Sequence, residues 1–322
     1  PKFVFDAGIL SSILKIFTNT PLVFFACIML TEPFTTPPTA RLQMVYGVIV
    51  GFLFAPAMHI GSFYTTPELA LLVGNVFSYI VSPKRRLALT LVEKNQLSPD
   101  IYDFVFKSDT SLAFRPGQYL EWTLGHEAPD ARGNRRYFTI ASAPTESMIR
   151  VGAKFYDNSS TFKKNLRDLN TGDVIFASQL AGDFTLPREK NRKLVFIAGG
   201  IGVTPFRSMV QYMIDMKEQR QVVMLYAGKT PQDLVYSDIF TKARLAFGMK
   251  TVYVVNKNEP YLPGITEGVI TTDLIIKEIP DYKERDFYIS GPHGMVMAFT
   301  DTLQTIGIPK RRIHSDFFPG LV

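Results

Sequence analysis

Residues 194–205 read Leu-Val-Phe-Ile-Ala-Gly-Gly-Ile-Gly-Val-Thr-Pro, and this stretch decides the fold of the C-terminal part of the chain. The apolar run predicts a buried strand, and the glycine-rich turn after it leads into a helix. Pro205 suits the first turn of that helix, because no backbone N–H is needed there. Glycines in such a turn let the backbone approach a pyrophosphate, which the free N–H groups of the helix start attract. The turn lacks the GxGxxG spacing of the common dinucleotide fingerprint.

The same alternation of strand and helix continues downstream of this turn. Apolar strands are predicted at 222–227, 251–255 and 287–290, with helical segments between them and a further helix from Pro292. Apolar strands that alternate with helices are typical of a parallel sheet covered on both faces. We therefore predict an α/β nucleotide-binding domain over residues 191–322.

Residues 84–190 show a different pattern, in which short alternating strands are separated by proline and glycine. The predicted strands are LALTLVEK, YDFVFKS, QYLEWTL, RYFTIAS and MIRVGAKF. Many short strands at regular spacing indicate a small antiparallel β-barrel. One helix is predicted after these strands, with Ser160 or Thr161 as its N-cap.

The N-terminal segment, residues 1–83, is apolar and nearly free of charge. Its basic and acidic side chains cancel, so the net charge of +6 lies in the remainder of the chain. The run Met44–Ile60 approaches the ~20 residues of a spanning helix. Two shorter runs, 16–30 and 69–81, are predicted as spanning, buried or re-entrant segments. The spacing of Gly47 and Gly51 allows close helix packing in lipid.

A basic cluster, Pro83-Lys84-Arg85-Arg86, follows the last apolar run. Positive residues beside a membrane segment favour the cytoplasmic side, so we expect a membrane protein whose larger C-terminal part is cytoplasmic. The alternative is a soluble protein with a hydrophobic N-terminal helical domain. The excess positive charge is consistent with a membrane-proximal surface or with an ordinary solvated one.

The composition argues against a metal centre in this chain. It has one cysteine, Cys27, whereas an iron–sulfur cluster needs about four thiolates. The four histidines are scattered without ligand spacing. No nucleic-acid partner is expected. The chain begins with proline and no signal-peptide pattern follows, so we expect further sequence upstream.

Three motifs in residues 84–190 resemble the flavin domain of the ferredoxin–NADP reductase superfamily: Arg115–Tyr119, Arg136–Thr139 and Ser160–Lys163. The resemblance implies that Arg136 grips a flavin phosphate with its fork of donors and that Tyr137 packs on the isoalloxazine. It also implies a Thr139 hydroxyl near flavin N5. The predicted FAD-binding residues are Arg136, Tyr137, Phe138, Thr139, Lys154, Ser160, Thr161, Phe162 and Phe318.

The GGxGxTP turn and the sequence Tyr288–Met295 resemble the pyridine-nucleotide domain of the same superfamily. Ser290 stands where the family usually has a cysteine beside the nicotinamide, which leaves hydride transfer plausible and its rate open. Lys229 follows the second strand and either meets a 2′-phosphate or is solvated, so the choice of NADH or NADPH stays open. The predicted NAD(P)-binding residues are Gly199, Gly200, Gly202, Val203, Thr204, Pro205, Lys229, Ser290, Gly291, Pro292 and Met295.

The chain ends with HSDFFPGLV, and members of this superfamily often end with an acid, an aromatic residue and a glycine. Asp316 matches the acid, and Phe318, or else Phe317, matches an aromatic residue near the flavin. The resemblance implies catalytic roles for Thr139, Ser290 and Asp316.

Residues 29–39, 45–53 and 68–83 are similar to the last membrane helices of a second family. This family comprises the flavin-carrying membrane subunits of Rnf-type complexes and of the sodium-pumping NADH:quinone reductase. Glu32 stands where that family has aspartate. The resemblance implies descent, and neither ion pumping nor a second flavin follows from it.

The sequence therefore predicts N-terminal transmembrane helices, an antiparallel flavin barrel and an α/β nucleotide domain. The predicted function is a membrane-bound NAD(P)H oxidoreductase that passes hydride to FAD, which is favoured over FMN. Membrane lipid and a redox protein or quinone are the expected partners. Two alternatives are a membrane-anchored reductase for a soluble acceptor, such as a ferredoxin or a ferric chelate, and a nucleotide-binding assembly or regulatory subunit without turnover.

Overall fold

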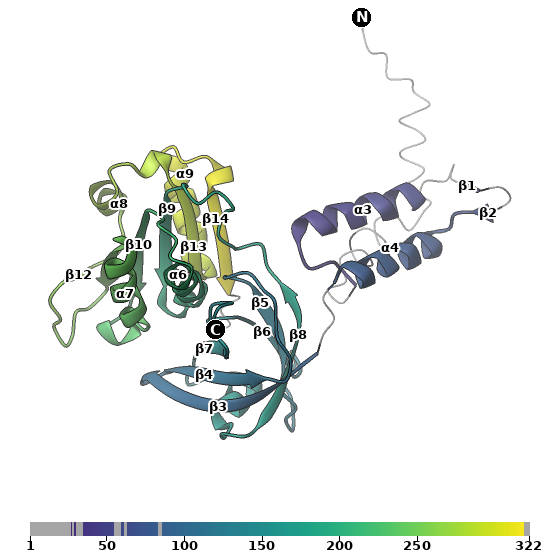
Figure 1. Ribbon diagram of the computed structural model, residues 1–322, viewed down its shortest axis with the longest axis horizontal. Coiled ribbons are helices and arrows are strands. Elements are labelled where there is room, and N and C mark those ends of the chain that lie inside the picture. Colours follow the sequence, from purple (N-terminus) through teal and green to yellow (C-terminus); the bar gives the residue numbers. More distant parts are fainter. Residues whose placement is uncertain are drawn as a thin grey trace, which may run out of the picture. The chain divides into compact units, whose positions relative to one another are not determined.

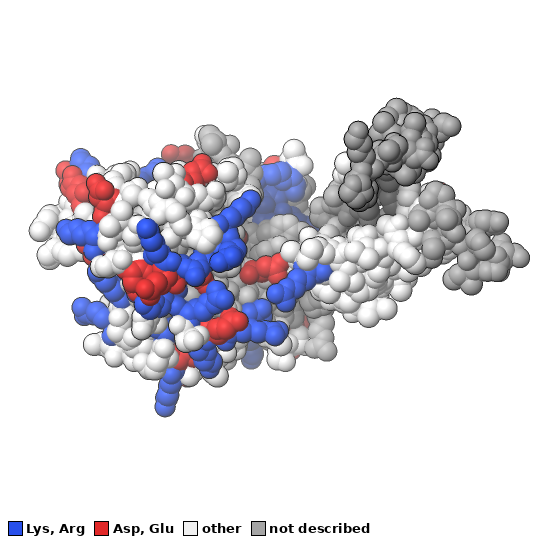
Figure 2. Space-filling view, turned by 90° about the horizontal axis from the view of Figure 1, so that it is seen from above, with Lys and Arg blue, Asp and Glu red and all other residues white. Residues whose placement is uncertain are grey.

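The computed structural model describes residues 35–54, 59–60, 63–82 and 86–318, together with Cys27 and Met29. The chain divides into two compact units, Pro1–Lys84 and Arg85–Val322. Figure 1 labels the elements of both units. Figure 2 shows that lysine, arginine and acidic side chains gather on the larger unit, as the charge pattern of the sequence predicts.

The N-terminal unit is a helical hairpin formed by α3 (Ala40–Phe54) and α4 (Pro67–Val81). Between them lies a two-stranded antiparallel ladder of β1 (His59–Ile60) and β2 (Phe63–Tyr64). Tyr46 and Val50 of α3 pack against Ala70 of α4 in a small core. Gly74 of α4 lies directly against this tyrosine and valine, whereas Gly47 and Gly51 are exposed. The predicted glycine pair therefore does not make the contact between the two helices.

The prediction of transmembrane helices is wrong for the residues that the structure describes. Among them, no helix is long and apolar enough to cross a membrane. Helices α3 and α4 have 15 residues each, so at 1.5 Å per residue each is about 22 Å long, short of the ~30 Å hydrocarbon core. The predicted run Met44–Ile60 is not one helix, because α3 ends at Phe54, just before Pro56, and proline disfavours helix in the residue before it. The run 16–30 lies outside the described residues, apart from Cys27 and Met29.

The first half of the larger unit is a six-stranded antiparallel sheet in the order β6-β5-β8-β3-β4-β7. Beyond the end of β6, Ala141 N donates to Arg150 O of β7 at 2.8 Å, which draws the two end strands together. The sheet encloses a core that includes Phe104, Trp122 and Phe162. Its elements are β3 (Leu87–Ser98), β4 (Ile101–Ser108), β5 (Tyr119–Thr123), β6 (Arg135–Thr139), β7 (Ile149–Lys154), α5 (Thr161–Asp168) and β8 (Val174–Ala181).

The second half is a six-stranded parallel sheet in the order β12-β11-β10-β9-β13-β14. Its strands are β9 (Leu194–Gly199), β10 (Val222–Gly228), β11 (Lys250–Val255), β12 (Ile265–Glu267), β13 (Asp286–Pro292) and β14 (Ile313–Phe318). Its helices are η2 (Gly200–Val203), α6 (Thr204–Asp215), η3 (Pro231–Asp233), α7 (Ser237–Phe247), α8 (Thr272–Glu278), η4 (Tyr282–Glu284), α9 (His293–Thr305) and η5 (Lys310–Arg312).

Two separate cores confirm that helices cover both faces of the parallel sheet. Alternate residues of a strand point to opposite faces. Phe196 of β9 packs in one core with Phe206 of α6 and Phe240 of α7. Ile197 packs in the other core with residues of α8 and α9. An antiparallel sheet followed by a parallel sheet fits the fold that the superfamily resemblance of residues 84–322 predicts.

The strand order creates a topological switch point at the carboxyl ends of β9 and β13. From β9 the chain moves outward through β10 and β11 to β12, and then returns to β13 on the other side of β9. Ligands of open α/β sheets bind at such a switch point, because the loops there leave in opposite directions. The glycine turn after β9 and Ser290–Gly291 at the end of β13 both lie at this point.

Candidate cofactor-binding site

The glycine turn packs directly on the end of strand β13. A Cβ on Gly202 would lie 2.6 Å from the carbonyl carbon of Ser290 and 2.7 Å from Cα of Gly291. Gly200 has a left-handed backbone with φ of +53°, and a Cβ there would meet open space. The turn is therefore closed on the β13 side and open at Gly200, which suits the approach of a phosphate.

The predicted loop residues lie in or beside this turn. Gly199 contacts Met295 and Pro292 of the β13–α9 corner. Helix α6 begins at Thr204 with Pro205 in its first turn, as predicted, and the Thr204 hydroxyl donates to Ile201 O at 3.2 Å.

Ser290 and Asp316 are neighbours in the β13–β14 register. Ser290 is fully buried, and within the described part of the chain its hydroxyl has no hydrogen-bond partner. Burial raises the pKa of the Asp316 carboxyl to about 6. A buried hydroxyl beside a carboxyl that titrates near neutral pH can hold or pass a proton, so the pair has the chemistry expected at a reaction centre.

The end of β14 brings this pair to the antiparallel sheet. Burial raises the pKa of the Tyr119 hydroxyl on β5, and the nearby Asp316 carboxylate raises it further. The Phe317 ring meets the His293 ring edge-on at 4.8 Å. Phe318 ends β14, and its side chain lies outside the described residues. Asp316 of the nucleotide half therefore lies near enough to Tyr119 of the flavin half to influence its ionisation.

A second cluster surrounds the start of helix α5. The Ser160 hydroxyl accepts from Lys163 N at 3.3 Å, which confirms Ser160 as the N-cap. The Thr161 hydroxyl accepts from Asp130 N at 3.1 Å and contacts His126 Nε2 at the same distance. These contacts tie the loop before β6 to the helix start, where free N–H groups favour an anion.

Arg136 of β6 points to this helix start. Its guanidinium donates to both carboxylate oxygens of Asp130 at 2.8 and 2.9 Å, and the side chain is only 13% exposed. In the described structure its Nε is buried without a partner. The guanidinium also lies 5.4 Å from the Phe162 ring centroid. A buried, unused donor on an arginine beside a helix start fits the diphosphate of a flavin nucleotide.

Lys163 lies near Arg132 and Arg136, so this cluster contains three positive charges. Burial, together with the positive charges of Arg132 and Arg136, lowers the pKa of the Lys163 ammonium from the ordinary 10.5 to about 8. Folding lowers the pKa of Lys163, so the unfolded chain takes up this proton at a higher pH than the folded protein does. The folded protein is therefore favoured above pH 10.5, and this stability is lost as the pH falls through 8. At neutral pH the cluster is therefore strained by positive charge that a bound anion would relieve.

FAD affinity is expected to fall as the pH rises from 7 to 9.5. A bound diphosphate favours the charged ammonium of Lys163, so binding takes up a proton above the free pKa of about 8. The affinity should fall by up to about tenfold per pH unit in this range. Fluorescence titration of the flavin-free protein with FAD would measure it. Lys163→Met should flatten the profile and the exposed control Lys164→Met should keep it; a flat wild-type profile would disprove the assignment.

Strand β6 distributes the predicted flavin residues over its two faces. Arg136 and Phe138 share one face, and Phe138 packs beside Phe162 with 5.9 Å between the ring centroids. Tyr137 and Thr139 share the other face. Tyr137 is 49% exposed, and its hydroxyl donates to Glu121 at 3.1 Å. Burial and the nearby Glu121 raise the Tyr137 pKa to about 12, and Thr139 is buried.

Lys154 and Lys229 lie at the junction of the two sheets. The Lys154 ammonium pairs with Asp233 and, at 3.1 Å, with Asp100, while the Lys154 carbonyl accepts from Lys163 Nζ at 2.8 Å. Lys229 is exposed after β10, and its backbone N–H donates to Asp233 at 3.0 Å. The Lys154 backbone therefore lies beside the helix-start cluster, while its side chain contacts the nucleotide half.

Three residues of this region were not singled out by the sequence: Lys163, Tyr119 and Asp233. Lys163 and Tyr119 stand inside the motifs that carry the superfamily resemblance, so the motifs located them without assigning a role. Asp233 forms part of a Thr-Pro-Gln-Asp capping box after β10, a signal that can be read from the sequence.

A separate cavity of about 560 Å³ lies at the opposite, amino end of the parallel sheet. Its charged lining is partly self-paired, since Arg192 contacts Asp286 at 2.7 Å. It contains none of the predicted site residues. Among the residues that the structure describes, no three His, Cys, Asp or Glu side chains are grouped to hold a metal ion. The lining consists of Arg192, Glu284, Asp286, Arg311 and Arg312.

Comparison with known proteins identifies the second sheet. Residues 196–301 match the family model of the oxidoreductase NAD-binding domain. This range begins in β9 and ends in α9, so it contains the glycine turn and the end of β13.

Curated relatives align with most of the larger unit. The chain is 28% identical over 239 residues to the flavohemoprotein of Oceanobacillus iheyensis, which covers 72% of this chain and 58% of that protein. It is 27% identical over 235 residues to the stachydrine N-demethylase reductase subunit of Rhizobium meliloti, covering 71% of this chain and 66% of that protein. The chain therefore spans somewhat over half the length of these relatives.

Solved structures share the fold. The cytochrome P450 reductase of Amycolatopsis matches with a TM-score of 0.65 and 23% identity, over 74% of this chain and 71% of that chain. The FAD/NAD-binding domain of nitric oxide dioxygenase from Vibrio cholerae matches with a TM-score of 0.64 and 22% identity, over 72% and 98%. The chain thus has the FAD- and NAD-binding fold of NAD(P)H-dependent flavoprotein oxidoreductases.

Proposed function

We propose that this chain is an NAD(P)H-dependent FAD oxidoreductase that supplies electrons to a redox partner protein. The observation that carries the proposal is the meeting of two sites within one compact unit. The glycine turn and Ser290 lie at the switch point of the parallel sheet, and Ile201 and Thr204 of that turn pack on Gly152 of the antiparallel sheet. Such an arrangement suits a reaction between a nicotinamide and a flavin held on opposite sides of one boundary.

The residues divide into those that hold the flavin and those that hold the nucleotide. Arg136, Lys163 and the free N–H groups of α5 would hold the diphosphate of FAD. Gly200, Gly202 and the start of α6 would hold the diphosphate of NAD(P)H. When bound, FAD supplies the chemistry that accepts hydride and releases electrons singly.

Ser290 and Asp316 would act at the nicotinamide side of the boundary. The Ser290 hydroxyl has no partner among the described residues and is therefore available to orient a bound group. Asp316, with its pKa at about 6, can take up or release a proton near neutral pH.

The proposed acceptor is a separate redox protein. Support comes from the relatives, which include the reductase subunit of stachydrine N-demethylase and the reductase component of propane 2-monooxygenase from Rhodococcus jostii. A cytoplasmic location stays a prediction. The resemblance of residues 29–83 to Rnf-type and sodium-pumping subunits also stays a prediction, and it concerns descent alone.

Stopped-flow absorbance tests the proposed function directly. Purified protein loaded with FAD is mixed anaerobically with NADH or NADPH, and the flavin band is followed. We expect rapid bleaching, at a limiting rate in the range of about 1–1,000 per second that enzymes usually show. Bound FAD that stays oxidised with both nucleotides would overturn the enzyme proposal and favour a binding or regulatory subunit. Failure to bind either FAD or FMN would overturn the flavin site.

A further inference from the structure

Strand β7 has two faces with different tasks. Val151 and Ala153 point into the core of the antiparallel sheet. Side chains alternate along a strand, so Arg150, Gly152 and Lys154 point the other way. Gly152 and Lys154 contact the nucleotide half directly, and Arg150 is connected to it through Asp103 and Glu146.

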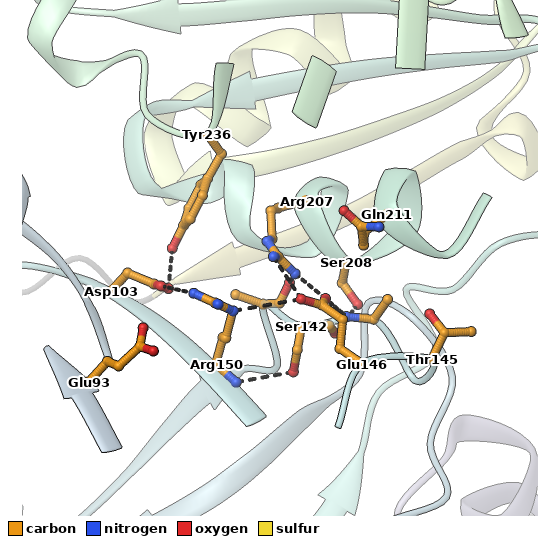
Figure 3. Close-up of polar contacts among 12 residues, drawn as sticks. Glu93, Asp103, Ser142, Thr145, Glu146, Arg150, Arg207, Ser208, Gln211 and Tyr236 are labelled. Carbon is orange, nitrogen blue, oxygen red and sulfur yellow. Dashed lines mark hydrogen bonds and ion pairs between the residues drawn. The ribbon is translucent and has the colours of Figure 1, made fainter. Parts of the chain in front are cut away.

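Arg150 begins a chain of polar contacts that crosses between the two sheets (Figure 3). Its guanidinium donates to Asp103 of β4 at 2.6 Å. The other oxygen of the buried Asp103 carboxylate accepts from the Tyr236 hydroxyl at 2.8 Å, and Tyr236 directly precedes helix α7. A hydrogen bond to a buried carboxylate is stronger than a neutral one, so this contact binds α7 to the antiparallel sheet.

A parallel contact joins helix α6 to the segment before β7. The Arg207 guanidinium makes a bidentate pair with Glu146, and it also donates to Ala141 O at 3.0 Å. The Ser208 hydroxyl donates to Ser142 O at 2.6 Å. Figure 3 shows Arg150 and Arg207 converging on Glu146 from the two halves.

Gly152 lets the nucleotide turn approach the strand. A Cβ at this position would lie 2.8 Å from Thr204 Cγ2, 2.8 Å from the Tyr236 hydroxyl and 3.2 Å from Ile201 Cδ1. Ile201 and Thr204 belong to the glycine turn itself. The turn that would hold the NAD(P)H diphosphate is therefore seated on β7, beside Tyr236.

Lys154 fixes the loop after β10. It pairs with Asp233, whose carboxylate also accepts from the backbone N–H groups of Lys229 and Thr230 at 3.0 and 3.1 Å. Asp233 is buried, and the lysine and these N–H groups hold its pKa below the ordinary value despite burial. The loop that contains Lys229 is thus connected to the flavin half through one ion pair.

Tyr236 carries the clearest sign of a constrained position. Its backbone is left-handed, with φ of 61°, which costs free energy for a residue with a bulky side chain. Tyr236 stands directly before α7, and this conformation directs its hydroxyl to Asp103 of β4. Such strain persists only where surrounding contacts impose it.

We infer that β7 aligns the NAD(P)H site with the flavin, and that Tyr236 and Lys154 are positioning residues for hydride transfer. Tyr236 sets the position of the glycine turn, and Lys154 sets the position of the loop around Lys229. The inference rests on the proposed function and extends it to residues outside the cofactor motifs. Misplacing reacting groups by about 1 Å can lower a rate about 100-fold.

The two residues predict different kinetic changes in the full chain loaded with FAD. Tyr236→Phe should lower the limiting rate of flavin bleaching about tenfold, with the half-saturating nucleotide concentration within about twofold of wild type. Lys154→Met should raise the half-saturating concentration about tenfold and change the limiting rate less. Lys154→Arg, which keeps the charge, should recover most of the loss. Controls are Tyr261→Phe and Lys164→Met, because both side chains are exposed.

Hydrogen exchange of the flavin-free protein gives a second readout that needs no turnover. Tyr236→Phe should speed exchange of amides in β7 and in the first turn of α7, and Tyr261→Phe should not. The inference is overturned if Tyr236→Phe and Tyr261→Phe show the same exchange. It is also overturned if the wild-type flavin bleaches and the Tyr236→Phe variant bleaches at the same limiting rate. If FAD bound to the wild-type protein fails to bleach, the proposed function fails. Amide exchange that is the same in Tyr236→Phe as in wild type would separately overturn the role of Tyr236.

Discussion

Gly202→Ala is expected to lower NAD(P)H-dependent flavin reduction at least about 100-fold. The added Cβ would lie 2.6 Å from the carbonyl carbon of Ser290 and 2.7 Å from Cα of Gly291. These are backbone atoms of a buried strand, so they cannot turn aside as a side chain can, and the glycine turn must move away from β13. Stopped-flow reduction over a range of nucleotide concentrations would measure the loss.

Gly294→Ala is the matched control for this prediction. Gly294 lies in the first turn of α9, shortly after the end of β13, and a Cβ there would meet nothing within 4 Å. Its reduction rate should stay within about twofold of wild type, because alanine suits a helix better than glycine does. FAD content should be normal in both variants. A Gly202→Ala protein that reduces FAD as fast as the Gly294→Ala protein would show that the turn does not hold the nucleotide.

Arg136→Ala is expected to weaken FAD binding about 100-fold, which corresponds to about 2.7 kcal/mol. The guanidinium is 13% exposed, with a buried Nε that has no partner among the described residues. Charge-assisted bonds from such a donor to a phosphate are among the stronger hydrogen bonds in proteins. Equilibrium dialysis or fluorescence titration of the flavin-free protein with FAD would give the affinity.

Arg135→Ala is the control for Arg136→Ala, because it removes an arginine side chain from the other face of β6. The Arg135 side chain is 48% exposed and pairs with Glu121 at 3.4 Å. This long pair joins a half-exposed guanidinium to a buried carboxylate on the opposite face of β6 from Arg136, so FAD affinity should stay within a few-fold of wild type. Arg136→Lys separates charge from geometry: it should bind FAD more weakly than wild type and more tightly than Arg136→Ala, because lysine lacks the planar fork. Equal losses in Arg135→Ala and Arg136→Ala would remove Arg136 from the flavin site.

The N-terminal unit shows where an apolar pattern was a poor guide. The run from Met44 is apolar enough for a membrane helix, but helix length depends on where the backbone can remain helical. Pro56 lies within the predicted run, and α3 ends at Phe54. Pro56 is therefore a signal in the sequence that the helix ends, and the apolar character of the run does not reveal it. Of the many apolar residues in the hairpin, few are buried, so hydropathy did not indicate burial here either.

Local features of the two cofactor sites could be predicted because they depend on neighbours in the chain. The Ser160 cap, the helix start at Pro205 and the strand before the glycine turn each follow from residues a few positions apart. Period-two alternation also determines that Val151 and Ala153 face a core while Arg150 and Lys154 do not. These rules require no knowledge of the tertiary fold.

The sequence by itself therefore determined most elements of the larger unit, but neither β12 nor β14, and it determined the motifs that resemble flavin and nucleotide sites. Tertiary structure alone decided which of these meet. Asp103 and Tyr236 are 133 positions apart, and Lys154 and Asp233 are 79 apart. No local rule relates residues at such separations, because their contact depends on how two sheets pack and on which strands flank the switch point. The raised pKa of Asp316 has the same origin, since burial between β14 and its surroundings exists only in the folded chain.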